Sequence, residues 1–240
     1  MSNVLNIISG ILLGMPCSML WGIPCMAGAC ALVRFICSEE GKEEELEKTY
    51  CVTNSVKAIW LVAFIMAGAV IYLKFPGNGA VFLPAAFFWM ISCLLLGFHS
   101  FTDFRSRLIY RSFAILSILN AVFFSLSWHI AAGDGISHMA VPAIFAIAYI
   151  FAGKFLFGFG DGLVLAACVF LAEPFIGMGA FGTVVYTLLH ISLAILLFLL
   201  THIKMFSLRQ FRMRERIAFC PSIAVALAAI VLAGGFLPVL

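Results

Sequence analysis

Long runs of apolar residues, separated by short polar or glycine-containing stretches, dominate the sequence. A helix needs about 20 mostly apolar residues to cross a bilayer. The first run contains Pro16 and Pro24 and exceeds one span, so we expect a span followed by a kinked or interfacial extension. The pattern predicts an all-α polytopic membrane bundle of about eight transmembrane helices, over residues 4–36, 56–73, 80–99, 112–132, 139–157, 162–178, 181–203 and 218–239.

Composition supports a membrane protein. The chain is 64% hydrophobic and 10% charged, whereas soluble domains carry about 25% charged residues. The net charge of +3 is too weak to indicate nucleic-acid binding. The eight cysteines are scattered and form no CxxC pair, so we expect apolar packing rather than a disulfide framework. No basic residue precedes the first apolar run, and a cleaved signal peptide is not expected.

The basic residues orient the predicted bundle. With eight spans, every lysine and arginine except Lys74 falls on the same side of the membrane. By the positive-inside rule that side is cytosolic, and both termini then lie outside. Two of the predicted cytosolic loops are longer than a short turn. We interpret residues 38–57 as a solvated helical extension. We interpret the basic loop 204–217 as an anchor for anionic lipid headgroups or as a means of steering an acidic partner.

Asp103 and Asp161 are the candidate catalytic residues. Each lies at the predicted cytosolic end of a membrane helix, and ionisable groups at membrane depth are expensive. Two converging carboxylates cannot easily ionise together, so the pair keeps one proton. The ionised member can activate a water, and the protonated member can polarise a carbonyl. The simpler alternative makes Asp161 an N-cap and pairs Asp103 with Arg105 or Arg107.

Three glycines surround Asp161. Gly158, Gly160 and Gly162 allow a sharp bend and the close approach of another chain, and an extended peptide could pair with such a backbone. Asp161 lies near a helix N-terminus, where the dipole favours a negative charge. We therefore predict Asp161 to be the ionised partner.

Five other ionisable residues receive structural interpretations. Glu173, before Pro174, reads as the end of a helix at the outer interface. His190 lies inside a span and can hydrogen-bond across helices. His99 shares a helix face with Asp103 and can influence it, although packing is the simpler role. His129 and His138 flank an outer turn.

Three motifs resemble those of the type IV prepilin peptidases, which are GxGD-type intramembrane aspartyl proteases. Gly158-Phe-Gly-Asp161 matches GxGD, and Asp103-Phe-Arg-Ser-Arg-Leu-Ile109 is similar to the first catalytic motif of that family. The stretch from Arg214 to Pro221 resembles its basic loop and Phe-x-Pro entry to the last helix. The motifs come in the family's order, and the resemblance covers roughly residues 80–240.

The resemblance implies a function. Asp103 and Asp161 would be the catalytic aspartates, with Gly158, Gly160, Gly162, Arg105 and Arg107 in supporting roles. The substrate would be a type IV prepilin-like membrane protein with a short basic leader, cleaved at the cytosolic face of the cytoplasmic (inner) membrane. Residues 1–57 would form an N-terminal helix and short cytosolic loop, and residues 58–240 the membrane-embedded peptidase domain. No cofactor and no nucleic-acid partner are expected.

The sequence also departs from the family pattern. Leu163 replaces a frequent lysine, for which Lys154 is a possible substitute, and Tyr110 replaces a proline. The cytosolic loop lacks the paired CxxC motifs of longer members, so we expect neither the zinc site nor the methyltransferase activity. Two alternatives remain open. One is a catalytically silent homologue acting in pilus or secretion assembly, and the other is an ion-coupled membrane carrier that uses both aspartates.

Overall fold

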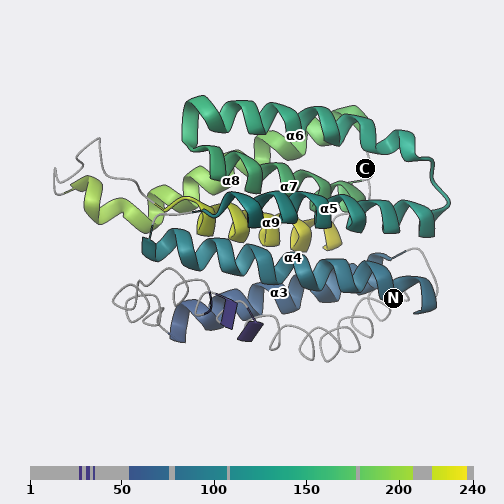
Figure 1. Ribbon diagram of the computed structural model, residues 1–240, viewed down its shortest axis with the longest axis horizontal. Coiled ribbons are helices and arrows are strands. Elements are labelled where there is room, and N and C mark those ends of the chain that lie inside the picture. The colour runs from purple at the N-terminus through teal and green to yellow at the C-terminus, as the bar shows by residue number, and fades with distance from the viewer. Residues whose placement is uncertain are drawn as a thin grey trace.

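The computed structural model describes residues 27–28, 31–32, 35, 54–75, 79–106, 109–176, 179–207 and 218–236. The described part of the chain is helical and contains no strand, which confirms the all-α prediction. Long helices run side by side, with successive helices in alternating directions (Figure 1). They are α3 (Asn54–Lys74), α4 (Gly79–Ser106), α5 (Arg111–Ala132), α6 (Ala140–Ala152), α7 (Phe159–Ile176), α8 (Gly179–Ser207) and α9 (Cys220–Phe236).

Four helical segments are long and apolar enough to cross a membrane. They are Leu83–Phe104, Arg111–Ala132, Ile136–Leu156 and Phe181–Thr201, and a shorter apolar helix covers Cys220–Gly234. These segments are those of a multi-pass membrane protein. The full set of eight spans and the sides of the termini stay predictions. Most of the first predicted span, most of loop 38–57 and residues 208–217 lie outside the described residues.

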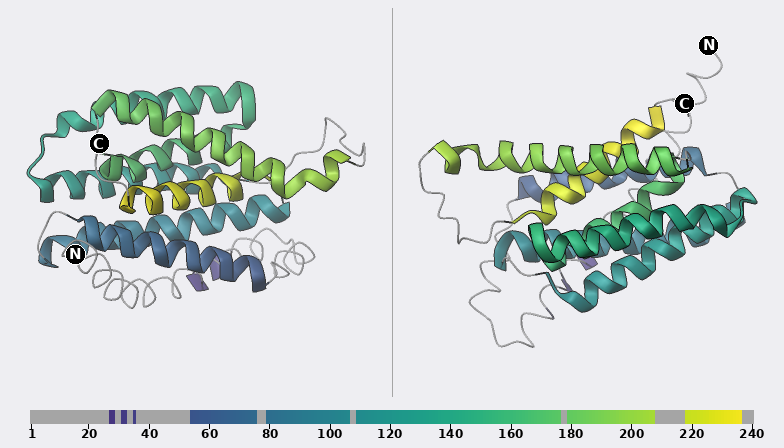
Figure 2. Two further views of the ribbon diagram at one scale, coloured as in Figure 1. Left: turned by 180° about the vertical axis from the view of Figure 1, so that it is seen from behind. Right: turned by 90° about the horizontal axis from the view of Figure 1, so that it is seen from above.

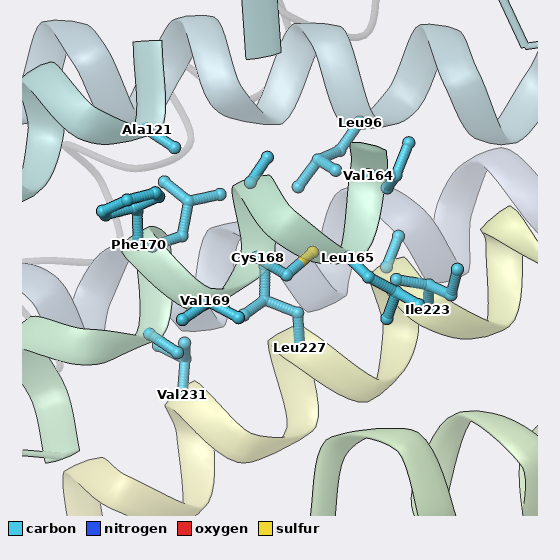
Figure 3. Packing of buried hydrophobic residues seen from close by; sticks show 14 of the residues in the cluster. Leu96, Ala121, Val164, Leu165, Cys168, Val169, Phe170, Ile223, Leu227 and Val231 are labelled. Carbon is cyan, nitrogen blue, oxygen red and sulfur yellow. The ribbon is translucent and has the colours of Figure 1, made fainter. Parts of the chain in front are cut away.

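Helix α7 forms the centre of the bundle. Every residue from 162 to 172 is buried, and α7 packs against α5, α6, α8 and α9. A helix that is apolar on all sides belongs in such a position. Small side chains at Ala166, Ala167 and Cys168 let the neighbouring helices approach closely. Figure 3 shows Leu165 and Val169 of α7 beside Ile223 and Leu227 of α9.

Helices α6 and α8 lie at the periphery. Large apolar side chains point outward from both, including Ile147 and Phe151 on α6 and Leu188 and Leu196 on α8. In a membrane these side chains would meet lipid, which satisfies them without further protein contact. The two helices lie on one side of the bundle and α3 on the other (Figure 1).

Helix α9 lies between helices from both halves of the chain. It packs against α3 and α4 as well as α7 and α8, and the view from behind shows it between α8 and α4 (Figure 2). A buried hydrogen bond links α8 to α9, because His190 Nε2 lies 3.0 Å from the Ile223 carbonyl oxygen. This bond confirms the interhelical role predicted for His190.

The connections at the two ends of α6 differ. Between α5 and α6, Gly133 ends α5 with a φ of 75°, in the left-handed region that glycine adopts without strain. A short 3-10 helix, η1 (Ile136–Met139), then leads into α6. At its other end α6 continues into a π-helical turn, η2 (Gly153–Phe157), which brings the chain to Gly158 and the start of α7. Isolated π turns of this kind often accompany functional sites.

Candidate active site

Three helix ends meet at one end of the bundle. Helix α4 carries Asp103 in its last turn, α7 carries Asp161 in its first turn, and α9 begins at Cys220. Asp103 is only 6% exposed, and the Cys220 backbone N–H donates a 2.9 Å hydrogen bond to its Oδ2. The N-terminus of α9 therefore holds the Asp103 side chain.

The two candidate aspartates come together as the sequence predicts. The carboxyl groups of Asp103 and Asp161 lie within electrostatic range of each other, and the Cys220 thiol lies within range of both. Asp161 is largely enclosed, and its Oδ1 has no hydrogen-bond partner among the described residues. Two carboxyl groups so placed favour a state with one shared negative charge, which gives the pair both a base and an acid.

Gly158 lies directly beneath the Asp161 side chain. A methyl group at residue 158 would be 3.0 Å from Asp161 Oδ2. The side chain thus folds back over the residue that precedes α7, and a larger residue at 158 would move the carboxyl group. Of the three glycines predicted to support the site, Gly158 is the one at which an added methyl group would meet a candidate catalytic side chain.

Gly160 and Gly162 are used in packing between segments. A methyl group at residue 160 would be 2.6 Å from Cβ of Ile109, in the short connection between α4 and α5. A methyl group at residue 162 would be 2.6 Å from the Tyr149 carbonyl oxygen and 2.9 Å from Cα of Gly153. Gly162 and Gly153 thus lie at a point where the α6–η2 segment and α7 approach each other closely. Gly153 was not predicted to take part in the site, and Ile109 was predicted only as the last residue of the Asp103 motif.

The basic residues near the site are only partly described. The Arg105 backbone lies in α4, but its side chain and all of Arg107 lie outside the described residues. Arg111, at the start of α5, lies over the Phe159 ring at 5.0 Å, which is a cation–π distance. It tethers the Gly158–Asp161 motif to α5. Lys154 is exposed and lies 5.8 Å from the Phe155 ring.

His99 lies one turn from Asp103 but is engaged elsewhere. Its Nε2 is 3.0 Å from Ser117 Oγ on α5, and that hydroxyl donates to the Phe113 carbonyl oxygen. The hydroxyl proton is thereby used, so His99 must donate through Nε2. The bond ties α4 to α5 just below the aspartates, in keeping with the packing role considered from the sequence.

A second cluster of ionisable residues lies at the opposite end of the bundle. His129 Nε2 is 2.8 Å from Glu173 Oε2, its Nδ1 is 3.4 Å from Asp134 Oδ2, and Ser125 Oγ donates to Glu173. The His138 ring stacks on the His129 ring. Glu173 therefore joins α7 to α5 rather than ending a helix, since α7 continues through Pro174 to Ile176.

The sequence carried a partial signal for two of these contacts. Pro221 marks the start of a helix, whose first N–H groups need acceptors. Ser125 and His129 are four residues apart and share a face of α5. Neither signal names a partner. Across the described residues, no group of three or more His, Cys, Asp or Glu side chains lies close enough to hold a metal ion.

Comparison with family models, with curated proteins and with solved structures finds no match to this chain.

Proposed function

We propose that the chain is a membrane aspartyl endopeptidase that removes the short basic leader from type IV prepilins or pseudopilins at the cytosolic membrane face. The observation that carries this proposal is the meeting of Asp103 and Asp161, from α4 and α7, within electrostatic range at one end of the bundle. A pair with one proton supplies both groups that peptide hydrolysis needs.

The surroundings of the pair suit this chemistry. Asp103 is buried and fixed by a backbone donor, while Asp161 leaves one oxygen without a partner. A water held between the two carboxyl groups could be activated by one and could attack a carbonyl polarised by the other. Fixed groups in an environment of low dielectric constant stabilise the developing charge more strongly than solvated groups do.

The membrane is part of the proposed mechanism. The substrate keeps its hydrophobic helix in the bilayer beside the enzyme, which raises its effective concentration at the site. The basic loop 204–217 would hold the cytosolic face against anionic lipid headgroups. We place the enzyme in the cytoplasmic membrane, with eight spans and both termini outside, and we expect it to need no cofactor.

The proposal is tested by co-expressing the chain with a prepilin. We expect the wild type to shorten the substrate, and Asp103→Asn and Asp161→Asn each to lose cleavage by at least about 10³-fold, because neither single carboxyl can act as both acid and base. Immunoblots of the membrane fraction verify insertion of each variant. Full activity in either variant would show that its aspartate is structural, and a wild type that cleaves no prepilin would refute the proposal.

An ion-coupled carrier is the second candidate. The observation that favours it is the cluster of Glu173, His129 and Asp134 at the other end of the bundle, because a carrier needs polar sites within reach of both membrane faces. Glu173→Gln separates the two functions. A peptidase with Asp103 and Asp161 as its catalytic pair keeps its cleavage rate in this variant, whereas a carrier that uses the outer cluster loses ion-coupled uptake.

A further inference from the structure

The first turn of α9 has one backbone donor left for a partner outside the helix. Pro221 has no N–H, and the N–H groups of Ser222 and Ile223 both donate to the Phe219 carbonyl oxygen. The Cys220 N–H remains, and it donates to Asp103 Oδ2 at 2.9 Å. Cys220 is fully buried, so water cannot easily replace this bond. Asp103 thus acts as the cap of a helix that is distant in sequence.

This bond favours a negative charge on Asp103. An N–H group can only donate, and it donates more strongly to a carboxylate than to a neutral acid. The positive end of the α9 dipole adds to the effect, because it lies at the same N–H group. A protonated Asp103 would weaken the bond and would leave the buried α9 terminus poorly satisfied.

Asp161 has different surroundings. Its Oδ1 lacks a hydrogen-bond partner among the described residues. The nearby Gly162 N–H is already used, because it donates to the Gly158 carbonyl oxygen at 3.0 Å. A carboxyl group with one oxygen that lacks a donor, next to a negative charge, is better accommodated with its proton on.

We propose that the Cys220 N–H is a positioning group that holds Asp103 as the ionised base of the pair and leaves Asp161 as the protonated acid. This inference rests on the proposed peptidase function. It reverses the assignment drawn from the sequence, which took Asp161 to be the charged member because of its place near the start of α7.

With Asp103 as the base and Asp161 as the acid, every proton moved during peptide hydrolysis has a donor and an acceptor. Asp103 takes a proton from water as the water oxygen bonds to the scissile carbonyl carbon, and Asp161 gives its proton to the carbonyl oxygen. The tetrahedral diol then collapses as the C–N bond breaks. Asp103 passes its proton to the leaving nitrogen, and one diol hydroxyl returns a proton to Asp161. Both side chains regain their starting states, and one water is consumed per bond cleaved.

The other charged or titratable groups near the pair are few among the described residues, which leave out the Arg105 side chain and Arg107. From α7, Asp161 acts on Asp103, and from α9 the Cys220 thiol lies within range of both. On α4 itself, His99 lies one turn away and is bonded to Ser117. Helix α5 brings Arg111 to the same end, where it lies over Phe159. The N-terminus of α9 bonds directly to one of the two aspartates, through the Cys220 N–H and Asp103 Oδ2.

The test compares two substitutions at residue 220 in the full-length protein. Cys220→Ala removes the thiol and keeps the N–H, whereas Cys220→Pro removes both. Proline is well tolerated at the first position of a helix. Cleavage of a purified prepilin is followed across pH in detergent. Relative to the alanine variant, we expect the proline variant to lose roughly 10- to 100-fold in kcat with little change in KM.

The pH profile distinguishes positioning from a general structural role. Without the N–H, the charged form of Asp103 loses its donor, so the acidic limb of the profile should move upward by about one pH unit or more. Identical pH profiles for the two variants would overturn the inference while leaving the peptidase function intact. Failure of the wild type to cleave any prepilin would instead overturn the proposed function, and this inference with it.

A second variant applies if Cys220→Pro does not accumulate in the membrane. Replacing the Phe219–Cys220 amide by an ester, through an α-hydroxy acid at residue 220, deletes the N–H without adding a ring. The alanine side chain is kept in both members of that comparison. A shift of the acidic limb of the pH profile to higher pH in the ester variant supports the inference, and an unchanged acidic limb refutes it.

Discussion

The contact between Gly158 and the Asp161 carboxyl makes residue 158 a sensitive position. The Cβ of Gly158→Ala would be 3.0 Å from Asp161 Oδ2, so the carboxyl group must shift away. Displacing a catalytic group by a fraction of an ångström to 1 Å costs roughly 10- to 100-fold in rate. We expect a loss of that size in prepilin cleavage, measured under single-turnover conditions, with a nearly unchanged thermal midpoint.

Gly234→Ala is the matched control for this substitution. Gly234 lies in α9, and the one atom of the described residues that its added methyl group would meet is Cβ of Phe175, at 4.0 Å. We expect this variant to cleave at the wild-type rate. Equal cleavage rates for Gly158→Ala and Gly234→Ala would mean that the rate does not depend on the position of the Asp161 carboxyl group seen in this structure.

The candidate aspartates were predictable because charge is conspicuous in an apolar sequence. Asp103 and Asp161 are costly at membrane depth, and this cost identifies them without knowledge of the fold. The donor to Asp103 was not predictable in the same way. A backbone N–H is present at every residue except proline, and only the arrangement of α9 against α4 selects the one at Cys220.

At the level of helices, the crossing at Gly153 and Gly162 fixes how closely the α6–η2 segment packs on α7. Gly162→Ala would place a methyl group 2.6 Å from the Tyr149 carbonyl oxygen, and a backbone atom cannot rotate away. We expect a loss of about 1–3 kcal/mol in the free energy of unfolding, measured by titration with a denaturing detergent. If this variant unfolded at the same detergent concentration as the wild type, the close packing of α7 on the α6–η2 segment at Gly162 would be contradicted.

Hydropathy located the helices but misplaced some of their ends. The predicted stretch 80–99 stops before Asp103, whereas α4 continues to Ser106. The additional turn is stabilised by hydrogen bonds such as that from Thr102 Oγ1 to the Phe98 carbonyl oxygen, which a transfer scale does not measure. The π turn η2 was not predicted; it begins at Gly153, which packs closely against Gly162 of α7, and hydropathy does not record such a contact.

At the level of the whole molecule, the orientation in the membrane is the main prediction still to be tested. Alkaline phosphatase, which is active only outside the cytoplasm, should be active when fused after residue 240 and inactive when inserted in residues 208–217. A fluorescent protein that matures in the cytosol should give the opposite pattern. A reversed pattern would put Asp103 and Asp161 on the outer side and would exclude cleavage at the cytosolic face.

The arrangement of helices around α7 could not be predicted from the sequence. All of the helices are apolar, so hydropathy assigns no neighbours. The burial of residues 162–172 and the location of α9 against α3 and α4 depend on side-chain shapes and on a few polar links, such as the bond between His190 and the Ile223 carbonyl oxygen. A sequence pattern predicts membrane helices, but it does not give their order in space.

The location of α9 has a consequence for how the protein is made. Ribosomes synthesise α3, α4, α7 and α8 before α9, yet α9 packs against all four. The contacts that α9 makes with these four helices therefore form only after α9 is inserted, and those with α3 and α4 join segments that are far apart in the sequence. A nascent chain that has not yet released residue 220 lacks the amide that bonds to Asp103, so the candidate site is completed only after α9 has been synthesised.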